Sequence, residues 1–200
     1  MRLLLVSDLH TDLEAAVAIV ARAPDFNAIV GAGDFAVKRR GLRKIIPVLA
    51  EIETPTILVP GNGESVEELA GACADWPAAH VLHGDGVELG GIPFFGLGGG
   101  VPVTPFGAWS YDFTEDEARG LLADCPPGAV LVTHSPPLGH ADVDRAGRHI
   151  GSLAVLEAVK RTRPRLVVCG HIHDSWGVRS RVGETPIANV GPRGTEWRLE

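Results

Sequence analysis

The stretch LLLVSDLHTDLEAAVAIVARAPDFNAIVGAGD, residues 3–34, predicts a strand, a helix and a second strand in succession. Its two aliphatic runs, residues 3–6 and 28–30, are typical of short buried strands. Between them, the pattern Thr11-x-x-Glu14 indicates a capping box that starts a helix over residues 12–22. A strand–helix–strand unit of this kind is typical of a parallel sheet whose faces are covered by helices.

The same alternation continues through the rest of the chain. Further helices are predicted over residues 42–51, 64–74, 114–123 and 152–161. Further strands are predicted over residues 56–59, 87–89, 92–97, 129–132 and 165–169. Residues 96–109, rich in Gly and Pro, predict a long irregular loop, and short antiparallel strands are expected over residues 176–181, 186–190 and 195–199. We therefore expect an α/β fold in a single domain that spans residues 1–200.

Composition narrows the class of protein. The chain has 200 residues, of which 45% are hydrophobic, which suffices for a full core and excludes a disordered chain. Its apolar runs are far shorter than the roughly 20 residues that a membrane helix needs. The apolar run near residue 1 is also too short for a signal peptide. Three widely spaced cysteines without a C-x-x-C pair predict reduced thiols and a cytoplasmic location: Cys73, Cys125 and Cys169.

The charge of the chain bears on its partners. The formal net charge of −7 disfavours binding to long nucleic acids, because such binding depends largely on Lys and Arg contacts to phosphate. Two basic clusters, within residues 38–44 and 179–181, are interpreted as solvated surface. The sequence therefore predicts neither a binding protein for long nucleic acids nor a membrane-bound one.

Polar residues follow five of the predicted strands, each at the carboxyl end of its strand. In open parallel sheets, these strand ends form the edge at which ligands bind. Each residue alone is most simply interpreted as a turn, a helix cap or a surface residue, but together they predict one site at one edge of the sheet. The residues, in chain order, are Asp8 and His10, Asp34, Asn62, His134, and His171 and His173.

The role predicted for Asn62 depends on the other polar residues expected at the same sheet edge. Asn62 lies in LVPGNGES, residues 58–65, between Gly61 and Gly63. On its own this pattern favours a tight turn, since Asn and Gly both tolerate a positive φ. With four other polar strand ends expected at the same edge, Asn62 is instead interpreted as a carbonyl ligand presented by a bent backbone.

The residue types predict the kind of site. Asp8 and His10 are two apart, so in an extended segment both side chains would point to one side, and His171 and His173 repeat this spacing. Carboxylate, imidazole and amide groups without a thiolate suit cations such as Mn²⁺, Fe²⁺ or Zn²⁺. Seven such residues exceed the needs of one ion and would fill two adjacent sites if Asp34 bridges them. Its strand is expected to lie centrally, and Gly33 permits a close backbone approach.

The resemblance to a known family rests on five short motifs in chain order: Asp8-x-His10, Gly33-Asp34, Gly61-Asn62, Thr133-His134 and Gly170-His171-x-His173. In this order they resemble the motifs of the calcineurin-like metallophosphoesterases. The resemblance covers residues 8–173, and the stretch 133–152 resembles the small bacterial phosphoesterases and their animal relatives within that superfamily. The resemblance implies a four-layer α/β/β/α sandwich with two divalent metal ions, of which Mn²⁺ is the first expectation and Fe²⁺ or Zn²⁺ the alternatives. One ion would bind Asp8, His10, Asp34 and His173, and the other would bind Asp34, Asn62, His134 and His171.

The resemblance also implies a reaction. A hydroxide that bridges the two metal ions would attack phosphorus in line, with Asp34, Asn62 and His134 as the catalytic ligands. In many members of the family a histidine follows the asparagine and lies near the leaving group, but this chain has Gly63 there. General acid–base catalysis is typically worth about 10²–10⁴-fold, so the change would favour esters with good leaving groups unless another side chain enters. His140 and His149 are the candidates for that side chain.

We therefore expect a two-metal phosphoesterase acting on a small phosphate-ester substrate, most readily a phosphodiester or a nucleotide. The alternative is a non-catalytic or weakly active metal-binding scaffold on the same fold that binds a protein partner. Four residues are predicted to contact the substrate: Trp109 and Tyr111 as stacking surfaces, Arg148 as a phosphate contact, and His149. The sequence predicts no particular substrate and no oligomeric state.

Overall fold

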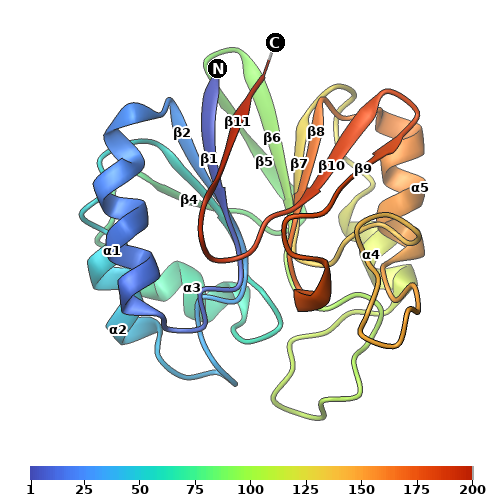
Figure 1. Ribbon diagram of the computed structural model, residues 1–200, viewed down its shortest axis with the longest axis horizontal. Coiled ribbons are helices and arrows are strands. Elements are labelled where there is room, and N and C mark those ends of the chain that lie inside the picture. The colour runs from blue at the N-terminus through green and yellow to red at the C-terminus, as the bar shows by residue number, and fades with distance from the viewer. Residues whose placement is uncertain (200) are drawn as a thin grey trace.

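Two β-sheets stacked face to face form the centre of the molecule (Figure 1). The computed structural model describes residues 1–199. In the first sheet the strand order is β11-β1-β2-β3-β4, in which β1 to β4 are parallel and β11 is antiparallel to β1. Its strands are β1 (Arg2–Val6), β2 (Ala28–Ala32), β3 (Thr56–Val59), β4 (Ala79–Val81) and β11 (Thr195–Arg198).

The second sheet has the strand order β5-β6-β7-β8-β10-β9. Its four inner strands run parallel to one another, and the two edge strands are antiparallel to their neighbours. The strands are β5 (Asp85–Leu89), β6 (Ile92–Leu97), β7 (Val130–Thr133), β8 (Leu166–Cys169), β9 (Arg179–Val182) and β10 (Thr185–Asn189).

Helices cover the outer face of each sheet, as Figure 1 shows on either side of the molecule. The first sheet is covered by α1 (Leu13–Arg22), α2 (Leu42–Leu49) and α3 (Val66–Ala72), and the second by α4 (Glu115–Leu121) and α5 (Leu153–Thr162). Two short 3-10 helices are η1 (Ala23–Asp25) and η2 (His173–Ser175). The four-layer α/β/β/α arrangement expected from the sequence is confirmed.

Strand periodicity explains why both faces of the sheets are apolar. In β1, Leu3 and Leu5 point into the core between the two sheets, whereas Leu4 and Val6 pack against the helices. Successive side chains of a strand point to opposite faces, so a strand covered on both sides must be apolar throughout. This accounts for the continuous aliphatic runs of the sequence.

Three predictions about the elements need correction. Helix α1 is capped by Asp12, whose carboxylate accepts from Ala15 N at 3.0 Å, because Thr11 is left-handed with φ 63° and cannot serve as the cap. Strand β10 was expected to be purely antiparallel, but it pairs in parallel with β8 and antiparallel only with β9. Strand β4 was not predicted as a separate strand, and it extends the first sheet at its edge.

The carboxyl ends of β1, β2, β3, β7 and β8 lie together, and the loops that follow them are joined by main-chain hydrogen bonds. In the first sheet, Asp8 N donates to Gly33 O at 2.8 Å and His10 N to Asp34 O at 2.9 Å. In the second sheet, Gly170 N donates to His134 O at 3.0 Å. The predicted meeting of strand ends is therefore a feature of the fold, and Asp34 follows the middle strand of the first sheet.

Within residues 1–199, none of the helices combines the length and the apolar character needed to cross a membrane.

Candidate metal centre

The structure gathers all seven predicted ligands at the shared end of the two sheets. Asp8, Asp34, Asn62 and His134 are buried, His10 and His171 are half-buried, and His173 is exposed. They form two neighbouring groups that have Asp34 between them. The residues that could hold metal ions therefore come from both sheets.

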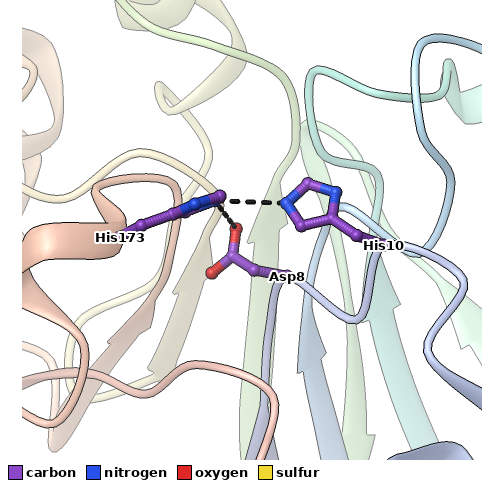
Figure 2. A group of neighbouring side chains, drawn as sticks. All are labelled: Asp8, His10 and His173. Carbon is purple, nitrogen blue, oxygen red and sulfur yellow. Dashed lines mark hydrogen bonds and ion pairs between the residues drawn. The ribbon is translucent and has the colours of Figure 1, made fainter.

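The first group consists of Asp8, His10 and His173, whose side chains point toward one another (Figure 2). The two histidine Nε2 atoms lie 3.1 Å apart, and His173 Nε2 lies 3.7 Å from Asp8 Oδ1. Oδ2 of Asp34 faces the same group, 3.6 Å from His10 Nε2. Two imidazoles and two carboxylates around one point are a suitable set for a divalent cation.

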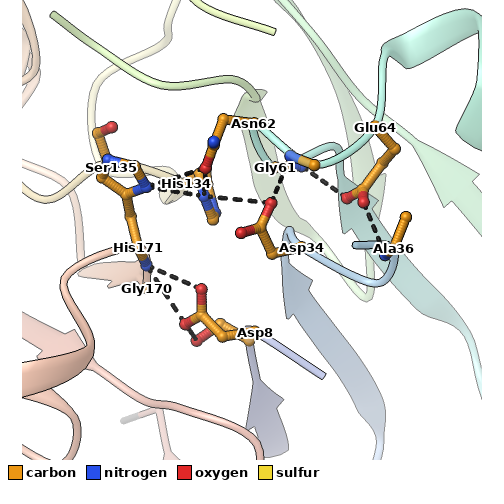
Figure 3. A network of polar contacts seen from close by, with 12 residues as sticks. Asp8, Asp34, Ala36, Gly61, Asn62, Glu64, His134, Ser135, Gly170 and His171 are labelled. Atoms are coloured by element: carbon orange, nitrogen blue, oxygen red, sulfur yellow. Dashed lines mark hydrogen bonds and ion pairs between the residues drawn. The ribbon is translucent and has the colours of Figure 1, made fainter. Parts of the chain in front are cut away.

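The second group consists of Asn62, His134 and His171 (Figure 3). Asn62 Oδ1 lies 3.2 Å from His134 Nε2 and 3.1 Å from His171 Nδ1, and the two histidine nitrogens are 3.2 Å apart. The second carboxylate oxygen of Asp34, Oδ1, lies 3.6 Å from His134 Nε2. Asp34 thus turns one oxygen toward each group, which is the geometry of a bridging carboxylate.

Hydrogen bonds to the outer side of the ligands show that these donor atoms suit a cation. His134 Nδ1 lies 2.8 Å from Ala32 O, and a carbonyl can only accept, so Nδ1 carries a proton there. Asn62 Nδ2 donates to Ser110 Oγ at 2.9 Å, which turns the amide oxygen inward. His10 Nδ1 likewise faces Ala36 O at 3.2 Å. The inward ring nitrogens and the amide oxygen are left as electron-pair donors facing one another, and metal ligands are typically oriented in this way.

The carboxylates of Asp34 and Asp8 favour positive charge at His134, whereas His171 is kept neutral. Burial lowers the pKa of His134, but the neighbouring carboxylates of Asp34 and Asp8 outweigh it and raise that pKa above its usual value. Burial, reinforced by the charge of His134, lowers the pKa of His171 to about 3. Burial opposes ionisation of Asp8, yet His173, His134 and Ser7 hold its pKa well below the usual range. The field that draws a proton to His134 would equally draw a metal cation.

The expected extended conformation of the ligand segments is wrong. Asp8, His10, Asp34 and His171 all have positive φ values, of 53°, 45°, 59° and 66°. Such a conformation is unfavourable for residues other than glycine and is found mainly at functional sites. One consequence is that His171 and His173 do not point the same way, because His171 faces the second group and His173 the first. The two-residue spacing therefore singled out residues that do lie together at this end of the sheets, although the chain there is not extended.

Asp8 is held by three hydrogen-bond donors, two of them side chains outside the ligand set and one the main-chain N–H of His171. Its carboxylate accepts from Ser7 Oγ at 2.5 Å, from Trp176 Nε1 at 3.0 Å and from His171 N at 3.1 Å. The ring of Trp176 also packs on that of His173, with the ring centres 4.4 Å apart. Trp176 therefore contacts two of the first-group residues, a role that nothing in the local sequence indicates.

Glu64 is a further residue that the sequence reasoning missed. It was interpreted as the start of a helix, but α3 begins at Val66 with Ser65 as its cap. The fully buried carboxylate of Glu64 instead accepts main-chain hydrogen bonds from Phe35, Ala36 and Gly61, at 3.2, 2.8 and 2.8 Å. Figure 3 shows the contacts with Ala36 and Gly61. Burial and the neighbouring Asp34 raise its pKa to about 7. It fixes the loops after β2 and β3 against each other.

The two glycines around Asn62 serve close packing rather than a left-handed turn, since neither has a positive φ. A Cβ on Gly61 would lie 2.0 Å from Asp34 Oδ1, so only glycine fits there. Gly63 N donates to Asp34 Oδ1 at 2.7 Å, and a Cβ on Gly63 would meet both that oxygen and Ala36 O at 3.0 Å. A histidine at position 63 would therefore require the segment after Asp34 to shift.

A cavity of about 450 Å³ opens beside the two groups. Of the four predicted substrate contacts, only Trp109 lines it, stacked on Phe106 with ring centres 5.7 Å apart. Other cavity residues that the sequence did not single out are Lys38, Arg145 and Ile150. Lys38 belongs to a basic cluster interpreted as surface, and it is exposed as well as cavity-lining.

The roles predicted for Tyr111, Arg148, His149 and His140 remain predictions, and the structure shows the partners of these side chains. Local partners engage each of these side chains, and none of the four lines the cavity. The Tyr111 ring packs on Phe113, Arg148 pairs with Asp144 at 2.6 Å, His149 Nδ1 lies 2.5 Å from Asp142 Oδ1, and His140 Nδ1 lies 2.9 Å from Ser180 Oγ.

Comparison of the sequence with known proteins finds a matching family and related proteins. Residues 1–175 match the model of the calcineurin-like phosphoesterase family. The human protein named metallophosphoesterase domain-containing protein 1 is 33% identical over 141 residues, which is 66% of this chain and 39% of that protein. Its mouse counterpart matches to the same extent. The matched region thus spans well under half the length of these relatives.

Solved structures share the fold. The crystal structure of TT1561 of Thermus thermophilus superposes with a TM-score of 0.77 at 21% identity, covering 96% of this chain and 90% of that one. A dimetal phosphatase from Danio rerio superposes with a TM-score of 0.59 at 14% identity, covering 96% of this chain and 88% of that one. At these identities the likeness extends to the fold alone.

Proposed function

The chain belongs to the calcineurin-like phosphoesterase family, and from that premise we propose that it is a two-metal phosphodiesterase of small phosphate diesters or nucleotides. The observation that carries the proposal is the carboxylate of Asp34, which turns one oxygen to each of two ligand groups, 3.6 Å from His10 Nε2 and 3.6 Å from His134 Nε2. A single-metal or purely structural site would need no such residue between two sets of donors.

Each group has its own ligands in this proposal. The first ion would be held by Asp8, His10, Asp34 and His173, and the second would be held by Asp34, Asn62, His134 and His171. Divalent cations at such a pair of sites supply an activated water for attack on phosphorus and offset the charge of the phosphoryl oxygens. Mn²⁺ suits the mixed oxygen and nitrogen donors, with Fe²⁺ or Zn²⁺ as alternatives.

The protein's own residues orient the ligands and shape the space for the ester. Ala32 O and Ala36 O fix the imidazoles of His134 and His10, and Ser110 fixes the amide of Asn62. Such outer hydrogen bonds hold the reacting geometry without reorganisation during turnover. Beyond the ligands, the cavity wall carries the apolar side chains Phe106, Trp109 and Ile150, which leave room for a second organic group on phosphorus. This apolar room supports a diester over a monoester.

Hydrolysis by protein of known metal content tests the proposal. Wild-type protein loaded with Mn²⁺ is assayed on methyl p-nitrophenyl phosphate and on p-nitrophenyl phosphate, a matched diester and monoester with one leaving group. We expect two ions per chain and faster diester turnover. Asp34→Asn is expected to lose metal binding at both groups and at least about 10²-fold in turnover, since it weakens the one ligand that both share. Full activity of this variant would contradict the two-metal assignment.

The same assay separates the alternative function. Wild-type protein that binds no metal ion and hydrolyses neither ester would favour the scaffold that binds a protein partner. A cytoplasmic site of action is also part of the proposal, and the free thiols of Cys73, Cys125 and Cys169 support it, because disulfides are rare in that compartment.

A further inference from the structure

Within residues 1–199, Lys38 is the one lysine or arginine lining the cavity beside the metal centre that makes no ion pair. Of its two cations, Arg145 lies 3.7 Å from Asp174, while the cavity residue Asp144 is paired with Arg148 at 2.6 Å. Lys38 makes no ion pair in the described part of the chain, residues 1–199, and its Nζ lies over the ring of Trp109, 5.7 Å from the ring centre. Lys38 is thus the cavity cation available to a ligand.

The turn that carries Lys38 has an unfavourable backbone. Val37 and Arg40 exchange two main-chain hydrogen bonds, at 2.9 and 3.0 Å, around a two-residue turn formed by Lys38 and Arg39. Both of these central residues are left-handed, with φ values of 48° and 66°. Turns of this kind strongly prefer Asn and Gly. Residues in such strained conformations cluster at active sites and ligand clamps, so a lysine kept in this position suggests a role for its side chain.

The turn is also fixed directly against Gly63. Arg39 N donates to Gly63 O at 2.7 Å, and Arg39 Nε lies 2.7 Å from Glu68 Oε2 in α3. Gly63 and Lys38 both line the cavity. A Cβ on Gly63 would lie 3.0 Å from Ala36 O, so the segment that leads into this turn packs tightly against position 63. Lys38 is thus the charged side chain that lines the cavity next to Gly63.

We propose that Lys38 is a substrate-binding residue whose ammonium group contacts a negatively charged phosphoryl oxygen of the ester. The proposal rests on the proposed function, of which it specifies one binding contact. An ammonium is a compact charge with three donors and suits phosphate oxygens. A cation–π contact at an exposed site is weak, so the ammonium can exchange the face of Trp109 for a stronger anionic partner. In a chain of net charge −7, one unpaired cation in the cavity would offset the repulsion of an anionic ester.

Binding of inorganic phosphate to the Mn²⁺-loaded protein tests this contact, because it requires no turnover. The variants are Lys38→Met, which keeps the bulk of the side chain and the same backbone strain, and Lys38→Arg, which restores the charge. Lys44→Met is the matched control, since Lys44 is an exposed lysine of α2 that does not line the cavity. Calorimetry gives the dissociation constant, and elemental analysis shows that metal content is equal in all four proteins.

We expect Lys38→Met to weaken phosphate binding on the order of tenfold, the scale of one hydrogen bond to a charged group. Lys38→Arg should stay within about threefold of wild type, and Lys44→Met should be unchanged. Phosphate binding by Lys38→Met within twofold of wild type, at equal metal content, would overturn the proposal even if the wild-type protein hydrolyses diesters. Weakened binding in Lys38→Met with no hydrolysis of any ester by wild type would support Lys38 and refute the proposed function.

Discussion

At the residue scale, the orientation of Asn62 depends on a short chain of hydrogen bonds. Its amide nitrogen donates to Ser110 Oγ at 2.9 Å, and the Ser110 hydroxyl donates to Asp112 Oδ1 at 2.8 Å. An amide has two ends of similar shape, so without this acceptor nothing would keep the oxygen directed at His134 and His171. Ser110 therefore orients the amide of Asn62, although Ser110 is not itself one of the predicted metal ligands.

Replacing Ser110 with Ala should weaken one metal site and leave the other intact. The change removes the acceptor for Asn62 Nδ2, and loss of such a partner typically costs 10–100-fold in metal affinity, so we expect about tenfold at the second group. Calorimetric titration of metal-free protein with Mn²⁺ would resolve the affinities of the two groups for the ion. Thr104→Val is the control, because Thr104 contacts Ser110 and Asp112 but not Asn62. Unchanged affinities in Ser110→Ala would show that Asn62 needs no such support.

The seven candidate ligands could be singled out from the sequence because each lies within four residues of the end of a strand, in a short motif. The residues that orient them could not be predicted in this way. Ser110 is 48 positions from Asn62, and Trp176 is 168 positions from Asp8, so their contacts arise only when the two sheets stack. The predicted substrate contacts Arg148 and His149 pair with acidic residues within their own loop, and the sequence reasoning did not consider these local pairs.

At the scale of elements, the buried carboxylate of Glu64 joins the loops that follow β2 and β3. It accepts from Phe35 and Ala36 on one loop and from Gly61 on the other. Three main-chain N–H groups would otherwise be buried without an acceptor, at about 1–3 kcal/mol each. This stabilisation is opposed by burial and by Asp34, which raise the pKa of the carboxyl to about 7.

Replacing Glu64 with Ala should lower the free energy of unfolding by about 3 kcal/mol or more, because three donors lose their acceptor together. Glu64→Gln should cost less, since one oxygen remains for two of the donors and the repulsion with Asp34 disappears. Urea denaturation of the metal-free variants gives the values. The exposed Glu67→Ala in α3 serves as the control and should stay within about 0.5 kcal/mol of wild type. An Ala variant as stable as the control would contradict this role of Glu64.

Most helices and strands could be predicted because capping motifs and hydrophobic periodicity lie within each element. The pairing of the strands could not be predicted from such local patterns. Capping by Asp12 rather than Thr11 depends on the left-handed conformation of Thr11, which follows from the loop around His10. The parallel pairing of β10 with β8 depends on where η2 and β9 return the chain. Neighbouring sequence carries no signal for either feature.

At the scale of the whole molecule, the candidate metal centre forms because the parallel strands of the two sheets end at the same side of the molecule. The first sheet supplies Asp8, His10, Asp34 and Asn62, and the second supplies His134, His171 and His173. Repeated strand–helix–strand units were enough to predict β1, β2 and β3 of the first sheet, but not its edge strand β4. The second sheet and the face-to-face stacking were predicted from the family resemblance rather than from periodicity, since short strands around glycines have no distinctive repeat.

The stacking also explains why Asp34 occupies the central position. Its strand, β2, is the middle strand of the first sheet and contacts β7 and β8 of the second. Its carboxylate can therefore reach His10 from its own sheet and His134 from the other, both at 3.6 Å. The account depends on this one residue serving two ions.

The most direct test is a crystal of the wild-type protein soaked in Mn²⁺ and measured for anomalous scattering. The account predicts two peaks, roughly 3.5–4 Å apart, on either side of the Asp34 carboxylate. One should lie among Asp8, His10 and His173, and the other among Asn62, His134 and His171. A single peak, or none, at a saturating concentration of Mn²⁺ would contradict the two-metal centre.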